Sequence, residues 1–344
     1  MKALGQFILS ILFLAIVIEF ILVGPTEIKD QFHQAIGRPA AKAIKNNELV
    51  NEKILDKKDE QVQQAMAGIH VIETKNENKE WELWAENAIG LKMQGDLTLQ
   101  DIKASFFADK GISFEVIGRT GSISSGSKNM TVGGGVVTTS SNGYIFNTTS
   151  LEYNSNKRTL LSPSQVQVSG PPDLVGKRLS IQGEEMLADL NLGTVSIERN
   201  VKAKKRIQRN QNMEVLAEKV NLSGHTKAVQ FSGNVAIRID GMNINSPDAL
   251  FKYNPNTEQL ESIDLEGGVK VKDIYKVATS EKLSINLVKN EYVFSGNPRV
   301  VQDNDEVRGD KIIFLDGGKK VKIQNAKVKV SEDTMKKNKY DRVK

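Results

Sequence analysis

Hydrophobic and polar residues alternate in short runs through most of the chain, from Ile69 onward. Runs such as VQVSG, LSIQG, VAIRID, VKVKD, LSINLV and VKIQNAKVKV place an apolar residue at every second position. This period of two is typical of a β-strand with one buried face. Turn-forming clusters, among them NSNKR, NPNTEQ, VKNE and DGGKK, separate the runs, and this pattern predicts an all-β sandwich or barrel. Because no long helix-period segment interrupts the runs, the strands are expected to be antiparallel.

A glycine followed by alternating apolar residues recurs along the chain. FSGNVAI begins at Phe231, FSGNPRV at Phe294, LEGGVKV at Leu265 and VGGGVVT at Val132. Three copies lie about 30 residues apart, a spacing at which a repeated structural unit is expected. Each unit also contains a strand, a turn and a returning strand, so the sequence predicts hairpins that stack to bury their apolar faces. The glycine is expected to mark a bulge or bend, and Pro298 to lie at an edge or bulge, because proline cannot donate to a sheet ladder.

The beginning of the chain has a different pattern. FILSILFLAIVIEFILV runs from Phe7 to Val23, interrupted only by Ser10 and Glu19, and approaches the roughly 20 residues needed to span a bilayer. A cleaved signal peptide is the alternative, but no A-x-A-like site follows the run. Residues 1–24 are therefore predicted to be an uncleaved transmembrane anchor. Glu19 is either a contact for a neighbouring membrane protein or a side chain that snorkels to the interface.

The other predicted boundaries follow changes in composition. The segment after the anchor is charged and favours helix, and the cluster VKAKKRIQRN divides the β-rich part in two. The predicted organisation is a helical stalk or linker (25–68), a first β domain (69–200), a basic linker (201–212), a second β domain (213–330) and a basic, flexible tail (331–344).

The residue composition limits the kinds of binding site and reaction that the protein is expected to have. The formal net charge is +5, the chain has no cysteine, and its three histidines are scattered, so no disulfide, metal site or other cofactor is expected. The sequence contains no nucleophile elbow, P-loop or HExxH motif, and we expect no catalytic residues and no enzyme activity. A pair of carboxylates brought together from distant strands would still allow a hydrolase. Nucleic-acid binding is not expected, because aromatic residues are few and lie on the apolar strand faces.

Three segments resemble a known family of envelope proteins. WELWAENA (Trp81 to Ala88) resembles the W-x-L-x-A entry strand of LptC, the bitopic inner-membrane component of lipopolysaccharide transport. LEYNSNKRTLLSPSQVQVSGPPDLVGKRLSI resembles its late hairpin and G-x-x-L strand, here Gly176 to Leu179. VQFSGNVAIRIDGMNINSPDALFKYNPNTEQLESIDLEGGVKV resembles LptA, the soluble periplasmic member built of G-x-V strands and A-x-x-x-Y hairpins. The resemblance spans most of residues 1–330.

This resemblance implies two consecutive stacked-hairpin β-jellyrolls, LptC-like over 69–200 and LptA-like over 213–330, whose apolar trough carries lipid. It implies a single-pass protein of the inner membrane of a Gram-negative bacterium, with most of the chain in the periplasm. The implied function is lipopolysaccharide transport from the inner to the outer membrane. The implied partners are lipopolysaccharide, the inner-membrane ABC transporter complex, near which Glu19 would lie, and an LptA-like or outer-membrane LptD-like jellyroll. The alternative is an anchored β-scaffold that binds envelope proteins by its sheet edges without carrying lipid.

Strand alternation, rather than the family motifs, selects the side chains expected to face the trough and bind lipid. The alternative for each is that it fills a closed core. The candidates are Trp84, Phe114, Ile145 and Tyr153 in the first domain and Phe231, Val235, Ile237, Phe251 and Tyr253 in the second.

Overall fold

The computed structural model describes residues 62–91, 95–109, 111–223, 226–303 and 305–330. They belong to one compact unit, Gln61–Lys344. The predicted anchor with Glu19, the stalk up to residue 61 and the tail 331–344 lie outside the described residues. Among the residues that are described, no helix has the length and apolar character needed to cross a membrane.

Antiparallel pairing between strands builds this unit, which confirms the all-β prediction. The strands form one sheet in which most pair with their neighbours in the chain. They are β1 (Val62–Lys75), β2 (Asn78–Leu91), β3 (Asp96–Phe107), β4 (Ser113–Ser124), β5 (Met130–Ser140), β6 (Ile145–Asn154), β7 (Thr159–Ser169), β8 (Ser180–Asp189), β9 (Thr194–Arg206), β10 (Asn212–Ala217), β11 (Lys219–Ser223), β12 (Ala228–Ile239), β13 (Met242–Tyr253), β14 (Leu260–Lys272), β15 (Lys276–Asn286), β16 (Glu291–Ser295), β17 (Arg299–Gln302), β18 (Asp305–Arg308), β19 (Lys311–Leu315), β20 (Lys320–Gln324) and β21 (Lys327–Lys329), with the 3-10 turns η1 (Gln208–Asn210) and η2 (Asp316–Gly318).

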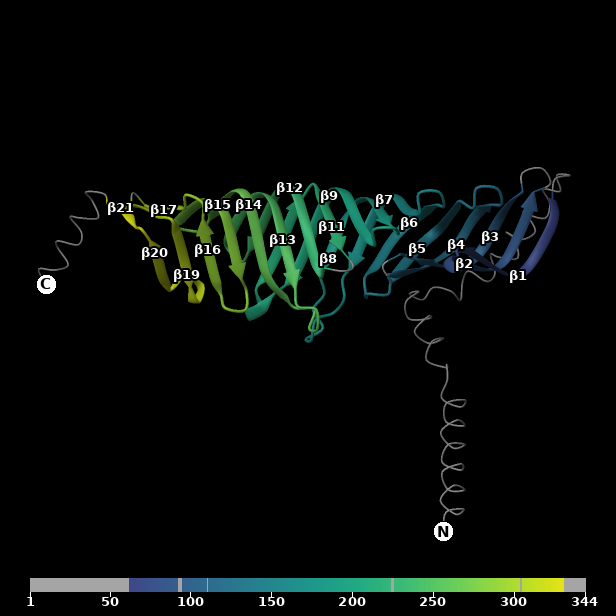
Figure 1. Cartoon of the computed structure of the whole chain (residues 1–344), viewed down its shortest axis with the longest axis horizontal. Helices are drawn as coiled ribbons and strands as arrows, with labels where there is room; N and C mark the ends of the chain where they lie inside the picture. Colours follow the sequence, from purple (N-terminus) through teal and green to yellow (C-terminus); the bar gives the residue numbers. More distant parts are fainter. Residues whose placement is uncertain (1–61, 92–94, 110, 224–225, 304, 331–344) are drawn as a thin grey trace, which may run out of the picture. The chain divides into compact units, whose positions relative to one another are not determined.

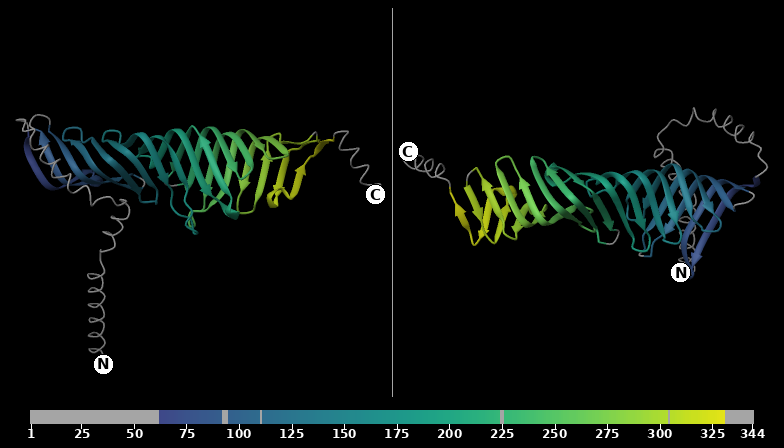
Figure 2. Two further views of the ribbon diagram at one scale, coloured as in Figure 1. Left: turned by 180° about the vertical axis from the view of Figure 1, so that it is seen from behind. Right: turned by 90° about the horizontal axis from the view of Figure 1, so that it is seen from above.

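The strands follow one another along the long axis of the unit, from β1 near one end to β21 near the other (Figures 1 and 2). This order results from hairpin pairing between consecutive strands, such as β2 with β3 and β13 with β14. Local pairing of this kind is what the repeated strand–turn–strand segments predict.

The repeated glycines lie at bulges, as the sequence predicts. Between β12 and β13 the register shifts after Ser232, and Gly233 has a φ of +79°. Gly267 (φ +88°) lies at the corresponding shift between β14 and β15. Pro298 lies between β16 and β17, where both pair with β15 and the register is broken. A bulge bends its strand and increases its twist, so these positions are bends in otherwise long strands.

Turns from opposite edges of the sheet contact each other. Successive turns of a meander alternate between its two edges, so the β3–β4 and β6–β7 turns lie on opposite edges. Arg158 in the second turn nevertheless donates a 2.9 Å hydrogen bond to the carbonyl oxygen of Phe107 and pairs with Asp109. Farther along, Gln208 after β9 donates a 2.7 Å bond to the carbonyl oxygen of Leu260. The sheet therefore folds over along its length, and its edges meet in a line that we call the seam.

Two predicted segment boundaries differ from the structure. Residues 62–68, expected at the end of a helical stalk, are the first part of β1 and pair with β2. Tertiary pairing overrides a local helix preference here. Residues 201–206, expected in a linker, complete β9, which pairs with β8 on one side and with β10 and β11 on the other. Hydrogen bonding thus continues from the first β-rich segment into the second.

Candidate functional site

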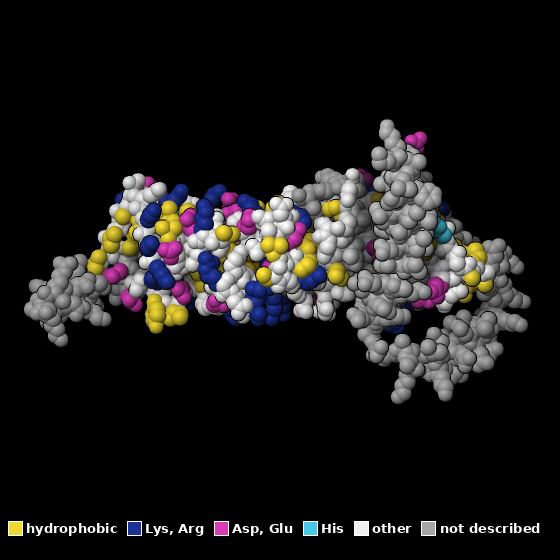
Figure 3. All heavy atoms as spheres, turned by 90° about the horizontal axis from the view of Figure 1, so that it is seen from below, with side chains coloured by type: hydrophobic (Ala, Val, Ile, Leu, Met, Phe, Trp, Pro, Cys, Tyr) yellow, Lys and Arg dark blue, Asp and Glu magenta, His cyan; other side chains and the backbone are white. Residues whose placement is uncertain are grey.

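The folded sheet encloses one continuous cluster of buried apolar side chains. The cluster extends from Trp81 in β2 to Ile312 in β19. The face seen in Figure 3, in contrast, carries Lys, Arg, Asp and Glu side chains interspersed with hydrophobic ones, and a group of basic side chains lies near the middle of the described body. The alternation in sequence therefore separates an apolar interior from a charged exterior. Because the cluster crosses β9, β10 and β11, both β-rich segments share one interior.

Seven of the nine candidate lipid-facing residues point into this interior. Six have small exposed fractions or are fully buried, and Tyr253 packs against the cluster with its hydroxyl buried. The seven are Phe114, Tyr153, Phe231, Val235, Ile237, Phe251 and Tyr253.

Trp84 and Ile145 are the two exceptions, and their predicted orientation is wrong. Trp84 lies on the outer face, where its ring stacks on His70 at 4.8 Å and its cross-strand neighbour is Lys103. Trp81, three residues earlier, lies on the opposite face and is completely buried. Ile145 is half-buried on the outer face, and the next residue, Phe146, points inward. Since side chains alternate along a strand, an error of one position reverses the face.

The sequence held signals for the interior residues that were missed. Trp81, Leu83 and Ala85, which stand at the W, L and A positions of the entry-strand motif, are all buried. Aromatic pairs also recur inside the body, with ring centroids close enough for favourable packing. These pairs are Phe106–Tyr153 (4.6 Å), Phe231–Phe251 (4.9 Å) and Phe294–Phe314 (5.7 Å).

Tyrosine hydroxyls add polar groups to the apolar interior. The Oη atoms of Tyr153 and Tyr253 are buried and have no hydrogen-bond partner among the described residues. Burial raises the pKa of Tyr153 to about 12 and raises the pKa of Tyr253 well above its usual value. Burial, with a contribution from Glu258, also raises the pKa of Tyr144 to about 12. The phenols are therefore neutral at physiological pH and can donate hydrogen bonds.

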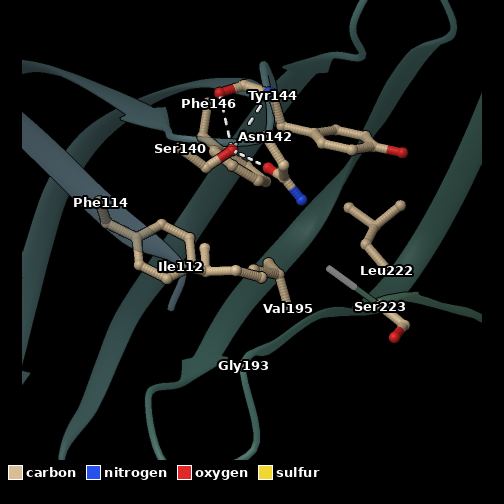
Figure 4. Close-up of a pocket in the computed structure, with 10 residues that line it drawn as sticks. All are labelled: Ile112, Phe114, Ser140, Asn142, Tyr144, Phe146, Gly193, Val195, Leu222 and Ser223. Atoms are coloured by element: carbon tan, nitrogen blue, oxygen red, sulfur yellow. Dashed lines mark hydrogen bonds between the residues drawn. The ribbon is translucent and has the colours of Figure 1, made fainter. Parts of the chain in front are cut away.

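Two cavities of different size lie among the side chains of the described body. Near the seam of the first half, Phe114, Tyr144, Val195 and Leu222 help to line a cavity of about 10 Å³ (Figure 4), which is roughly the space for one water molecule. The Tyr144 ring in this view points away from Ser140, toward the side of Leu222.

A larger cavity lies toward the C-terminal end. It has a volume of about 190 Å³, and Met242, Val271, Tyr292 and Phe294 are among its lining residues. This is below the roughly 300–1,000 Å³ of pockets that bind drug-sized ligands. The cavity has room for part of an apolar chain, and a larger ligand requires the interior to widen.

Ionic and polar contacts close the seam. The Arg158 guanidinium reaches Asn191 at 3.0 Å and Glu80 at 3.4 Å, in addition to its contacts with Phe107 and Asp109. It thereby joins turns that are far apart in sequence. Near the middle, Arg209 donates a 3.1 Å hydrogen bond to the carbonyl oxygen of Leu287, beside the Gln208 contact. The Asp109 amide also donates a 3.0 Å hydrogen bond to the carbonyl oxygen of Leu190 across the seam. The seam is thus held by local contacts, most of them from side chains, and not by a continuous strand ladder.

Comparison with known families agrees with the order of segments expected from the sequence. Residues 42–206 match the family described as lipopolysaccharide-assembly, LptC-related, and residues 214–319 match the LptA/(LptD N-terminal domain) LPS transport protein family. The chain joins an LptC-related segment to an LptA-like segment. It is therefore a component of lipopolysaccharide transport. The pairing of β9 with β10 and β11 lies where the LptC-related match ends and the LptA-like match begins.

One solved structure is similar to part of the chain. It is the crystal structure of LptH from Pseudomonas aeruginosa, described as the LptA homologous periplasmic component of the conserved lipopolysaccharide transport device. The match has 14% sequence identity and a TM-score of 0.33, and covers 36% of this chain and 97% of the LptH chain. No curated protein gives a significant match.

Proposed function

We propose that the apolar interior is the path along which this chain passes lipopolysaccharide, with the acyl chains inside and the headgroup at the seam. The observation that carries the proposal is the continuity of one apolar cluster through both the LptC-related and the LptA-like segments. Transfer of acyl chains from water to such an interior gains about 0.8 kcal/mol per buried CH₂. Passage needs no covalent chemistry, so the protein acts as a carrier and not as an enzyme.

Entry of lipid requires the seam to part. The cavity near the C-terminal end has a volume of about 190 Å³, and the cavity lined by Phe114 and Tyr144 has a volume of about 10 Å³, so neither holds a whole lipid. The seam contacts are few and local, whereas the strand ladder runs through the whole sheet. The two sheet halves therefore separate at the seam while the ladder stays intact.

The predicted anchor, residues 1–24, would fix the chain in the inner membrane with its β unit in the periplasm. There Glu19 would lie near the ABC transporter, from which the LptC-related segment would accept lipid. This part of the proposal is supported by the long apolar run in the sequence and by the LptC-related match.

The end strands would join neighbouring proteins by β-augmentation. Among the described strands, β1 pairs only with β2, β20 only with β19, and β21 only with β18. Val321 and Val328 near the C-terminal end are well exposed. An LptA-like or LptD-like jellyroll is the partner we propose for this end.

Site-specific photo-crosslinking in cells tests the path with matched positions on one strand. A crosslinking residue at Phe251, which points inward, should capture lipopolysaccharide, and one at Lys252, which is exposed on the same strand, should not. Trp81 and Trp84 form a second matched pair, inward and outward, on β2. If inward and outward positions capture equal amounts, or none capture lipid, the proposed path is wrong.

A protein scaffold without lipid is the second candidate, and the unpaired edges of the end strands favour it. It predicts that depletion of the chain leaves outer-membrane lipopolysaccharide at its normal level. The lipid path predicts that lipopolysaccharide accumulates at the inner membrane.

A further inference from the structure

One lysine on β9 points into the apolar interior instead of toward solvent. Along this strand Val201, Ala203 and Lys205 are buried, whereas Lys202 and Lys204 between them are exposed. The Lys205 side chain is only 3% exposed. A buried ammonium is costly unless it is paired, so its surroundings are informative.

The groups around the Lys205 ammonium leave it incompletely satisfied. The Nζ atom lies 3.6 Å from Oδ2 of Asp173 and donates a long, 3.4 Å hydrogen bond to the carbonyl oxygen of Lys177. It also lies 5.8 Å from the centre of the Tyr253 ring, within the range of a cation–π contact. An ammonium has three donors and prefers acceptors at about 2.7–3.2 Å. The Tyr253 hydroxyl adds another buried donor without an acceptor among the described residues.

Charged groups of both signs surround the Lys205 ammonium. Burial lowers the pKa of Lys205, while Asp173 opposes that change; Lys177 lowers the pKa further and Glu258 raises it. The Glu258 carboxylate is already paired with Lys227. Asp173 is thus the acid that directly faces the Lys205 ammonium.

Asp173 belongs to the β7–β8 loop, residues 170–179, whose turn it stabilises through its other oxygen. Asp173 Oδ1 accepts hydrogen bonds from the backbone N–H groups of Lys177 (2.8 Å) and Val175 (3.1 Å). Only Oδ2 is directed to Lys205. Apart from the Lys205 contacts, a long 3.5 Å hydrogen bond from Lys177 Nζ to the carbonyl oxygen of Ile207 also joins the loop to the end of β9. Because the turn has its own hydrogen bonds, the loop can leave Lys205 without losing its local structure. Its tip carries two exposed apolar side chains, Leu174 and Val175.

The position of Lys205 is next to the seam. Gln208 and Arg209, which follow on the same chain segment, reach across to Leu260 and Leu287 on the opposite edge. A headgroup that travels along the seam would therefore pass Lys205 at the point where the two family-matched segments meet.

We propose that Lys205 and Tyr253 form a binding site for a phosphate group of the transported lipid, which displaces Asp173 and releases the β7–β8 loop. This proposal rests on the lipid path proposed above. A phosphate carries up to two negative charges and three strong acceptor oxygens, so it satisfies donors that one carboxylate oxygen at 3.6 Å leaves unused. Exchange of one anion for another keeps the buried ammonium paired throughout. The site thereby couples arrival of a headgroup to release of the β7–β8 loop beside the seam, in the middle of the body.

Binding of three probes to the detergent-solubilised full-length chain tests the site. The probes are lipopolysaccharide, enzymatically dephosphorylated lipopolysaccharide and inorganic phosphate. The variants are Lys205→Gln, Lys205→Arg and Asp173→Asn. The matched control is Lys204→Gln, since Lys204 lies on the outer face of the same strand and pairs with Glu214. Thermal unfolding followed by circular dichroism shows whether each variant is folded.

The wild-type chain should bind phosphorylated lipid more tightly than dephosphorylated lipid. Lys205→Gln should bind phosphorylated lipid about tenfold more weakly, which is about 1.4 kcal/mol, and should lose the preference. Lys205→Arg and Lys204→Gln should keep it, and Asp173→Asn should bind several-fold more tightly because the competing carboxylate is gone. If Lys205→Gln is unfolded, the gain in Asp173→Asn becomes the deciding result. Inorganic phosphate should compete with lipid in a Lys205-dependent manner.

Several outcomes would overturn the proposal. A preference for phosphorylated lipid that Lys205→Gln retains, or that Lys204→Gln loses equally, would show that Lys205 is not the site. Lys205-dependent binding of inorganic phosphate without any lipid preference would assign the site to the free ion. A wild-type chain that binds both lipids equally would refute this inference and leave the lipid path standing, whereas one that binds neither would refute both.

Discussion

The bulge at Gly233 is predicted to be essential to the bend of β12. Replacement by alanine places a residue with a Cβ at a φ of +79°, which costs about 1–2 kcal/mol. The new Cβ would also lie 2.5 Å from Oε2 and 2.7 Å from Cβ of Glu218, and relief of such overpacking costs about 1–3 kcal/mol. We therefore expect Gly233→Ala to lose roughly 2–5 kcal/mol of local stability. Gly241→Ala is the matched control, since a Cβ there meets nothing within 4 Å.

Hydrogen exchange of the full-length chain is the appropriate assay, because stacked hairpins need not unfold in one step. The Glu218 amide donates a 3.0 Å bond to the carbonyl oxygen of Gly233 and reports directly on the bulge. Its protection should fall in Gly233→Ala, while peptides from β2 and β3 keep theirs. Glu218→Ala should reduce the penalty of Gly233→Ala without abolishing it, because the backbone strain persists. Equal protection in Gly233→Ala and Gly241→Ala would refute the reasoning.

Three further predictions concern the interior and the seam. Phe231→Ala and Phe251→Ala should each destabilise the body by about 3–5 kcal/mol. A double-mutant cycle measured by urea unfolding should give a coupling energy of about 0.5–1.5 kcal/mol between the two rings. Fully additive effects would contradict their ring contact. Arg158→Ala should lower the stability of the fold by about 3 kcal/mol and increase amide hydrogen exchange in the β3–β4 and β8–β9 turns. Lysine at this position should not restore protection, because it lacks the planar guanidinium group. Unchanged hydrogen exchange in these turns would show that Arg158 does not hold the seam. The raised pKa values of Tyr144 and Tyr153 stabilise the fold below pH about 10, the ordinary tyrosine value, and this contribution is lost as the pH rises toward about 12. Phenolate absorbance from these residues should therefore appear together with loss of the circular dichroism signal, and ionisation near pH 10 in an intact fold would be inconsistent with their burial.

The proposed path places an unusual demand on this fold, because the interior is both a structural core and a channel. Side chains such as Phe231 and Phe251 are fully buried in the apolar cluster and contact one another. Lipid chains would replace these contacts with equivalent apolar contacts, so opening loses less than exposure to water would. The seam contacts at Arg158, Gln208 and Arg209 then set how readily the interior opens.

The sequence by itself determined the features that depend on neighbouring residues. Alternation with period two indicated strands, and turn clusters separated them. The repeated glycine at Gly233 and Gly267 predicted bulges, because a positive φ suits glycine best. Pro298 predicted a break in the ladder, since proline has no N–H to donate. Short motifs also indicated the order of the LptC-related and LptA-like segments, which the family matches confirm.

The tertiary structure decided which face each strand presents and which distant turns meet. Trp84 and Ile145 were assigned to the interior, yet the register of their strands places Trp81 and Phe146 there. Pairing with β2 turned residues 62–68 into strand. The same applies to Lys205: its strand predicts alternation, but only the folded sheet shows that the buried side includes an ammonium facing Asp173 and Tyr253. The physical reason is that a shift of one residue reverses every side chain on a strand, and the energy that selects the register comes from partners remote in sequence.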